Sequence, residues 1–294
     1  MQLRVVVKIM KFNKLLFGPA GFGGSNLIKI PASSSNPTSD AIPSIKKAGL
    51  DTLEIEFVHS VYLKNSTKEK LDSIKNNSKK FDFPLSIHAP YFINLNAKEE
   101  PKLQNSYRYI LDSLNVGERI GARVVVFHIG FFLKDEPSQA MNRVEKELLY
   151  LQDKFKGDVL LGTELVGKKT QIGSLEEILS LYDKLDHKFL FPVIDFAHLH
   201  ARENGFFKLQ KNLDNTFEIL KSYPDVVSRM HIHLSGINYT EKGERNHLMF
   251  QDADIPYKKI LEGLKDINAK GTIICESPEP VFDALLLKKE YEKL

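Results

Sequence analysis

Short apolar runs alternate with longer amphipathic stretches along the whole chain. Eight runs rich in Val, Ile, Leu and Phe predict strands, near Leu15–Gly18, Thr52–Phe57, Leu85–His88, Arg123–His128, Val159–Glu164, Phe189–Asp195, Arg229–His233 and Thr272–Glu276. The stretches between them have helical spacing, with apolar residues mostly three or four apart. Strands that alternate with helices indicate parallel βαβ units, and nearly continuous apolar strands indicate burial on both faces. Eight such units predict a closed α/β barrel.

Local signals place several helix boundaries. Ser174 with Glu177 three residues later forms a capping box, and Gly49 and Gly121 are typical helix stops. We expect Ser39-Asp40 to precede the first helix and the polar stretch Pro31–Asp40 to be the first βα loop. A (β/α)₈ TIM barrel of this size is commonly one domain. The sequence therefore predicts a single domain over residues 1–294, with the barrel proper at about 15–287.

Composition and charge narrow the protein class. The single cysteine, Cys275, excludes an intramolecular disulfide and suits a reducing compartment, and we expect its side chain to lie in the core under the outer helices. No apolar run is long enough to span a membrane. The N-terminal apolar run is broken by Lys8 and Lys11, so we expect no secretion signal and a cytoplasmic location. A net charge of +3 is too mild to require a nucleic-acid partner.

The chemistry-bearing residues stand at the ends of the predicted strands. Six successive strands end on an imidazole or a carboxylate: His88, His128, Glu164, Asp195, His233 and Glu276. Their spacing of 31 to 43 residues is about one βαβ unit, so each unit returns to the same face of the barrel. That C-terminal face holds the active sites of TIM barrels. One such residue usually anchors a loop or caps a helix, whereas six in succession favour a metal site.

The residue types indicate which metals would bind. Carboxylates that converge on one rim repel each other, and divalent cations remove that cost. Mixed nitrogen and oxygen ligands suit Zn²⁺, with Mn²⁺ or Fe²⁺ as substitutes. Nearby candidates are His198, Glu244 and His247. His231 lies two residues before His233 and one layer lower, where a hydrogen-bonded core histidine is favoured over a ligand.

The segments SIHAPYFINLN, VFHIG, IDFAH, HLSG and ICESP resemble the endonuclease IV family of abasic-site endonucleases, within the xylose isomerase-like barrel superfamily. The resemblance runs from about Leu15 to Leu287. It implies base-excision repair activity, in which the phosphodiester 5′ to an abasic site is hydrolysed to leave a 3′-hydroxyl. It also implies three Zn²⁺ ions per chain, whose close spacing can activate a water and neutralise charge on the phosphate.

Carried over by position, the family pattern makes Glu164 a bridging carboxylate. His88 and His128 would join it on the first metal, and Asp195, His233 and Glu276 on the second, with Glu164 and Glu276 as the catalytic carboxylates. His198 would hold the third metal with two ligands from the loop after the seventh strand. Here the sequence departs from the family's Asp-x-His pair, since it offers Glu244, Asn246 and His247.

The resemblance also implies that the partner is double-stranded DNA containing abasic sites. It further implies that the protein acts as a monomer and does not bind a membrane. Tyr91 matches a family aromatic that wedges into the duplex, and packing on the barrel rim is an equal alternative for this side chain. Lys168 and Lys169 follow Glu164 in a βα loop where they would meet phosphates, although a bare pair of lysines is often only solvated surface.

Two other functions fit parts of this pattern. A sugar isomerase or epimerase would use Glu164, Asp195, His233 and Glu276, but has no need of the imidazoles at His88, His128 and His198. A non-catalytic binder of damaged DNA that has lost its third metal is favoured only by the altered Glu244/His247 loop.

Overall fold

A computed structural model describes residues 12–23, 25–57, 61 and 66–294. The expectation about the N-terminal apolar run falls mainly on residues 1–11 and lies outside the described residues. No helix in the described ranges is long and apolar enough to cross a membrane.

The described residues contain one sheet of eight strands in which every neighbouring pair is parallel. The strands are β1 (Leu15–Pro19), β2 (Leu53–Glu56), β3 (Leu85–His88), β4 (Val124–Phe127), β6 (Leu160–Glu164), β8 (Leu190–Asp195), β9 (Met230–His233) and β12 (Gly271–Cys275). Their order is β1-β12-β9-β8-β6-β4-β3-β2. The edge strands meet at a bridge between Ala20 and Glu54, where Gly21 N donates to Glu54 O at 2.9 Å. The predicted barrel and its eight strands are confirmed.

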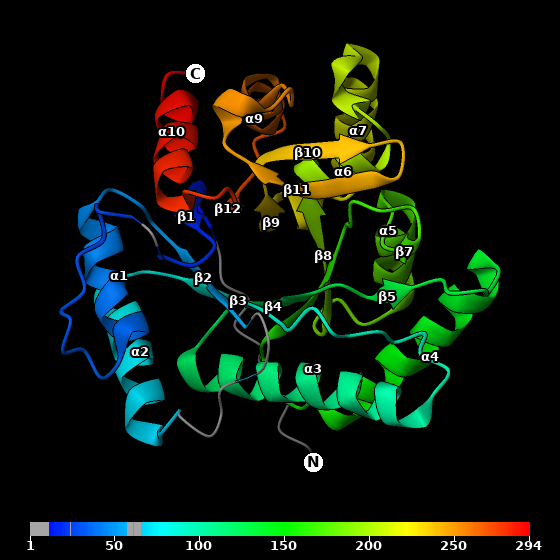
Figure 1. Cartoon of the computed structure of the whole chain (residues 1–294), viewed down its shortest axis with the longest axis horizontal. Coiled ribbons are helices and arrows are strands. Elements are labelled where there is room, and N and C mark those ends of the chain that lie inside the picture. Colours follow the sequence, from blue (N-terminus) through cyan, green and yellow to red (C-terminus); the bar gives the residue numbers. More distant parts are fainter. Residues whose placement is uncertain (1–11, 24, 58–60, 62–65) are drawn as a thin grey trace.

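Helices surround the barrel (Figure 1). They are α1 (Pro37–Lys47), α2 (Lys68–Lys80), α3 (Glu100–Ile120), α4 (Pro137–Lys154), α5 (Leu175–Lys184), α6 (Phe196–Arg202), α7 (Gln210–Lys221), α8 (Pro224–Val227), α9 (Tyr257–Asp266) and α10 (Pro280–Glu292), with the 3₁₀ turns η2 (Phe206–Lys208) and η3 (Phe250–Asp252). Most of the long helices bury an apolar stripe. In α3 the stripe includes Ile110, Leu114 and Ile120, all fully buried, as their spacing predicts.

The helix boundaries follow the sequence signals except at α1. The Ser174–Glu177 capping box is present, and Gly121 ends α3 with a φ of 74°, a left-handed conformation that favours glycine. The prediction that Ser39-Asp40 precedes the first helix is wrong. α1 begins at Pro37, whose fixed φ suits the first helical position, so the first βα loop is shorter than expected.

The βα loops carry two small antiparallel sheets that the apolar pattern did not predict. β5 (Gly130–Phe131) pairs with β7 (Gln171–Ile172), and β10 (Gly236–Thr240) pairs with β11 (Gly243–Leu248). Both lie in connections that follow the carboxyl ends of barrel strands. The segment around Glu244 and His247, expected as a loop, is therefore the second strand of a hairpin.

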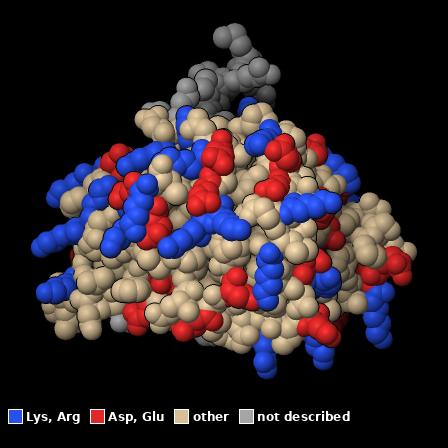
Figure 2. All heavy atoms as spheres, turned by 90° about the horizontal axis from the view of Figure 1, so that it is seen from above, with Lys and Arg blue, Asp and Glu red and all other residues tan. Residues whose placement is uncertain are grey.

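The core runs through the barrel and under the helices, and Cys275 is buried in it as expected. The surface carries charges of both signs. On the face seen in Figure 2, Lys and Arg side chains are interspersed with Asp and Glu.

Candidate metal centre

Glu164 lies at the centre of the predicted ligands. It ends β6 and is fully buried, and both of its carboxylate oxygens face imidazoles. Oε2 is 3.1 Å from Nε2 of His88 and 3.0 Å from Nε2 of His128. Oε1 is 2.9 Å from Nδ1 of His233 and 3.4 Å from Nδ1 of His198. This carboxylate is therefore placed to be shared between neighbouring sites.

The second predicted ligand set converges beside Glu164. Asp195 ends β8, and its Oδ1 accepts a 2.7 Å hydrogen bond from the backbone N–H of His198, which caps α6. Its Oδ2 makes no hydrogen bond within the described residues. Glu276 follows β12, with Oε2 3.3 Å from Nδ1 of His233. Ligand atoms of Glu164, Asp195, His233 and Glu276 all lie within 4.8 Å of one another.

The electrostatics of this set indicate a shortage of positive charge. Burial raises the pKa of Asp195 to about 8, so this carboxyl holds a proton near neutrality. Burial alone would lower the pKa of His233, but the charges of Glu276, Glu54 and Glu164 raise it well above its ordinary value. Burial would raise the pKa of Glu164, yet the His233 and His128 imidazoles hold it well below the usual range. A divalent cation would supply the charge that these protons now provide.

The third predicted set is also assembled. Nε2 of His198, on α6, is 3.5 Å from Oε2 of Glu244 on β11, and ligand atoms of His198, Glu244 and His247 lie within 4.8 Å of one another. Nδ1 of His198 contacts the carbonyl of Leu165 at 3.0 Å, and Nδ1 of His247 contacts Ser235 Oγ at 2.7 Å. Both imidazoles therefore keep Nε2 for a ligand.

A β-bulge explains how Glu244 and His247 share one face. In a regular strand, residues three apart point to opposite faces. Along the hairpin, Asn238 pairs with Asn246 and Tyr239 pairs with Glu244, so β11 carries Arg245 as an extra residue. This bulge shifts the alternation by one and brings both side chains to His198. The departure from the Asp-x-His spacing is thus compensated by backbone geometry.

The donor set fits divalent cations. It combines imidazole nitrogens with carboxylate oxygens, and Zn²⁺, Mn²⁺ and Fe²⁺ all bind ligands of these two kinds. Buried oxygens without hydrogen bonds among the described residues, in Asp195 and Glu276, point into it. His88 and His128 with Glu164, the second set and the third set each form a group able to hold an ion.

The residues predicted to contact DNA differ in the side chains that surround them. Tyr91 is 42% exposed, its ring lies 4.7 Å from that of His88, and its hydroxyl donates to Glu56 Oε2 at 3.4 Å. Lys168 and Lys169 follow β6, and Nζ of Lys169 is 2.8 Å from Glu203 Oε2. Lys169 is therefore already paired with a carboxylate.

The sequence analysis did not predict Glu54 and Glu56 as residues of the site. They lie on β2 and face the centre, with ligand atoms within 4.8 Å of those of Glu276. The signal was available, because two acids spaced two apart in the otherwise apolar run TLEIEF share one face of the strand. His231, favoured as a core histidine, is buried and contacts Thr272 Oγ1 at 2.7 Å and Glu54 Oε2 at 2.8 Å.

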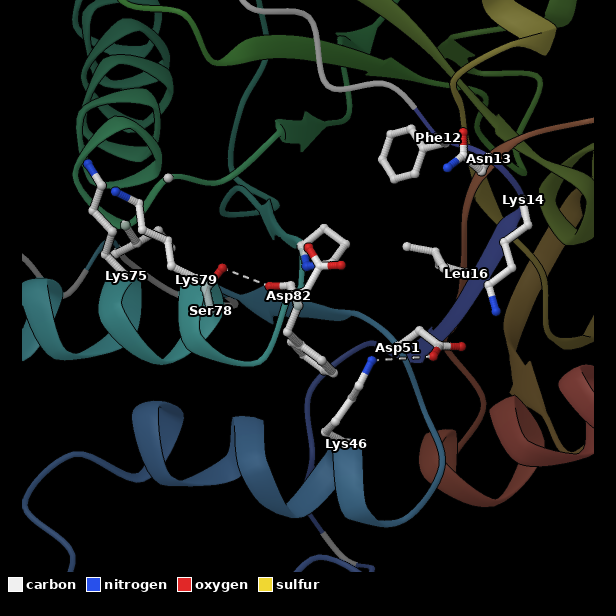
Figure 3. A pocket seen from close by; sticks show the side chains of 14 residues that line it. Phe12, Asn13, Lys14, Leu16, Lys46, Asp51, Lys75, Ser78, Lys79 and Asp82 are labelled. Carbon is white, nitrogen blue, oxygen red and sulfur yellow. Dashed lines mark hydrogen bonds and ion pairs between the residues drawn. The ribbon is translucent and has the colours of Figure 1, made fainter.

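A separate pocket of about 550 Å³ lies at the opposite end of the barrel (Figure 3). Its lining comes from segments that precede strands, including Lys14 before β1, Asp51 before β2 and Pro84 before β3. Lys46 approaches Asp51 there at 3.7 Å. Because the predicted ligands all gather at the carboxyl ends of the strands, this pocket is not part of the candidate centre.

Relatives of the chain carry two kinds of name. An uncharacterized protein of Methanocaldococcus jannaschii is 36% identical over 290 residues, which cover 95% of this chain and 98% of that protein. A probable endonuclease 4 of Mycoplasmoides gallisepticum is 28% identical over 216 residues, 69% of each chain.

Solved structures with the same fold include enzymes of two kinds. Endonuclease IV from Thermus thermophilus has a TM-score of 0.67 and 18% identity, covering 89% of this chain and 97% of that one. The 3-keto-D-glucoside 4-epimerase of E. coli has a TM-score of 0.66 and 16% identity, covering 96% and 100%. At these identities, the likeness concerns the fold alone.

A family model described as xylose isomerase-like TIM barrel matches residues 42–292. That match spans most of the barrel and every predicted ligand from His88 to Glu276. The chain therefore belongs to the xylose isomerase-like TIM barrel family, and within it is similar to proteins named endonuclease 4.

Proposed function

We propose that this protein is a metal-dependent endonuclease that hydrolyses DNA 5′ to an abasic site and leaves a 3′-hydroxyl. The observation that carries the proposal is the third ligand group, His198 with Glu244 and His247, beside the two groups that share Glu164. A sugar isomerase needs only the set on the later strands. Three adjacent groups match the charge that develops on a phosphodiester in hydrolysis.

The proposed ions are Zn²⁺, with Mn²⁺ or Fe²⁺ as substitutes, one in each group. Bound there, divalent cations would lower the pKa of a water and neutralise charge on the phosphate and the leaving oxygen. Glu164 would hold two sites at a fixed separation, because its two oxygens face different imidazoles. Glu276, 9% exposed in its side chain, is the carboxylate of the second group that we propose acts with Glu164 in catalysis.

Tyr91 is the side chain proposed to enter the duplex. Its ring is part-exposed and packs on His88 and His128, at centroid distances of 4.7 and 5.3 Å. An aromatic ring here would fill the space left when an abasic nucleotide is turned out of the stack, an operation made cheap by the missing base. Lys168 would contact a phosphate on the adjacent loop, and Lys169 would do so after leaving Glu203.

The experiment uses a duplex with one tetrahydrofuran abasic analogue, which cannot undergo β-elimination. The purified protein, without added metal, should incise it on the 5′ side and leave a 3′-hydroxyl, and prolonged EDTA treatment should abolish the cut. A duplex of the same sequence without the lesion is the control. Absence of incision, even after Zn²⁺ or Mn²⁺ is restored, would refute the proposal.

A sugar epimerase is the second candidate. It is favoured by the set Glu164, Asp195, His233 and Glu276 and by the similarity in fold to 3-keto-D-glucoside 4-epimerase. Ketose epimerisation with a metal-loaded protein that leaves the abasic duplex intact would support it.

A further inference from the structure

A line of buried polar side chains crosses the barrel interior below His233. Arg123 Nη1 donates to Thr272 Oγ1 at 3.3 Å, and Thr272 Oγ1 is 2.7 Å from Nδ1 of His231. Nε2 of His231 is 2.8 Å from Oε2 of Glu54, and Oε1 of Glu54 is 2.9 Å from Nε2 of His233. Each of these side chains is at most 8% exposed. Of these five side chains, only His233 is a predicted metal ligand.

The direction of the hydrogen bonds follows from which groups can donate. Arginine only donates, so Thr272 accepts from Arg123 and directs its own hydroxyl proton to Nδ1 of His231. Since Nδ1 of His231 accepts from Thr272, the proton of this imidazole lies on Nε2, which faces Glu54. That proton is donated to Oε2 of Glu54.

Glu54 then presents one remaining oxygen to His233. Oε2 of Glu54 accepts from His231, so Oε1 is the oxygen that faces Nε2 of His233, at 2.9 Å. Within the described residues, neither Oε1 of Glu54 nor Nε2 of His233 has a hydrogen-bond partner, and their 2.9 Å approach is an ion-pair contact. A proton on Nε2 of His233 directed at the Glu54 carboxylate suits both atoms and leaves Nδ1 for the second ligand set.

We infer that Glu54 is a positioning residue, which, backed by Arg123, Thr272 and His231, holds His233 in the tautomer and orientation that offer Nδ1 to the second metal site. The inference rests on the ligand role proposed for His233. Metal-binding histidines usually donate their other ring N–H to a carboxylate or carbonyl, which fixes the ring. The backbone of Glu54 is itself fixed, because it lies at the barrel seam and bonds Gly21.

The test compares metal binding by Glu54→Gln and Thr272→Val with that by Glu56→Gln. The last variant replaces a carboxyl group on the same strand, two residues on, where the Glu56 side chain contacts Tyr91. Zn²⁺ affinity is measured for the full chain by competition with a chromophoric chelator, and the visible spectrum of the Co²⁺-loaded protein reports coordination. Thermal unfolding confirms that each variant folds.

We expect Glu54→Gln to weaken one site by about 10- to 100-fold and to alter the Co²⁺ spectrum. Thr272→Val should shift the same site in the same direction by less, and Glu56→Gln should leave it closer to the wild type. If Glu54→Gln fails to fold, Thr272→Val carries the test.

Three outcomes would overturn the inference: unchanged affinity in both Glu54→Gln and Thr272→Val, equal losses in Glu54→Gln and Glu56→Gln, or an additional ion that Glu54→Gln removes entirely. The last result would make Glu54 a ligand. No DNA is used, so a wild-type protein that binds metal without incising abasic DNA would refute the proposed function and leave this inference standing.

Discussion

Gly167 and Glu244 come from different loops and pack directly against each other. The backbone N–H of Glu244 donates to the Gly167 carbonyl at 3.0 Å. A Cβ on Gly167 would lie 2.6 Å from Cβ of Glu244, 2.8 Å from its Oε2 and 3.1 Å from Cδ2 of His198. The absence of a side chain at residue 167 is therefore a condition for the third ligand group.

Gly167→Ala should consequently impair the third metal site. The added methyl must push Glu244 away from His198, and such overpacking costs about 1–3 kcal/mol of folding stability. We expect fewer ions per chain after dialysis against a fixed free Zn²⁺ concentration, measured by elemental analysis, and slower incision. Gly23→Ala, where an added Cβ meets no atom within 4 Å, is the matched control. Full metal content in Gly167→Ala would contradict the packing argument.

The metal-free protein should lose stability as pH rises above neutrality. Burial alone would lower the pKa of His88, but its hydrogen bond with Glu164 and the charges of Glu56 and Glu164 raise it to about 10. The stabilisation is complete below the unfolded value of 6.5 and is lost as pH rises through 10. Burial raises the pKa of Asp195 to about 8. The stability that its proton provides is therefore also lost as pH rises, between its unfolded pKa of 3.8 and pH 8.

A bound cation takes the place of these protons. The difference in Tm between Zn²⁺-loaded and EDTA-treated protein should therefore widen from pH 6 to pH 9. Thermal unfolding followed by circular dichroism at each pH measures it. A difference that is constant or that narrows over this range would show that protons and cations do not compete at the centre.

Glu164→Gln should disable two ligand groups at once. The substitution keeps the shape but removes the charge that faces His88, His128 and His233. We expect lower metal content and incision slower by at least about 10²-fold, as for loss of a group that stabilises transition-state charge. Glu145→Gln, which breaks the 2.9 Å ion pair with Lys184 on the outer helices, should incise normally. Normal metal content in Glu164→Gln would remove this residue from the bridging role.

The barrel and the face that carries the centre could be predicted because each depends on local pattern. Apolar runs give strands, and a polar residue that ends a strand must lie at its carboxyl edge. The fit of Glu244 with His247 was not predictable, because the bulge at Arg245 depends on pairing with β10. The contact between Glu54 and His233 was also hidden, since it joins residues far apart in the chain across the barrel interior. The start of α1 was misplaced because Ser39-Asp40 resembles a cap, whereas Pro37 begins the helix.

Tyr91 should contribute to DNA affinity without affecting metal content. Base–aromatic stacking is worth about 1–3 kcal/mol, so Tyr91→Ala should weaken binding of an abasic duplex by about 5- to 150-fold at fixed salt. Tyr91→Phe keeps the ring and should bind nearly as the wild type does, since it loses only the 3.4 Å contact with Glu56. Tyr150→Ala is the control, because Tyr150 is equally exposed on α4 and stacks on Tyr107 instead. Fluorescence anisotropy with EDTA-treated protein separates binding from incision. Wild-type affinity in Tyr91→Ala, or an equal loss in Tyr150→Ala, would mean that Tyr91 only packs on the rim above His88 and His128.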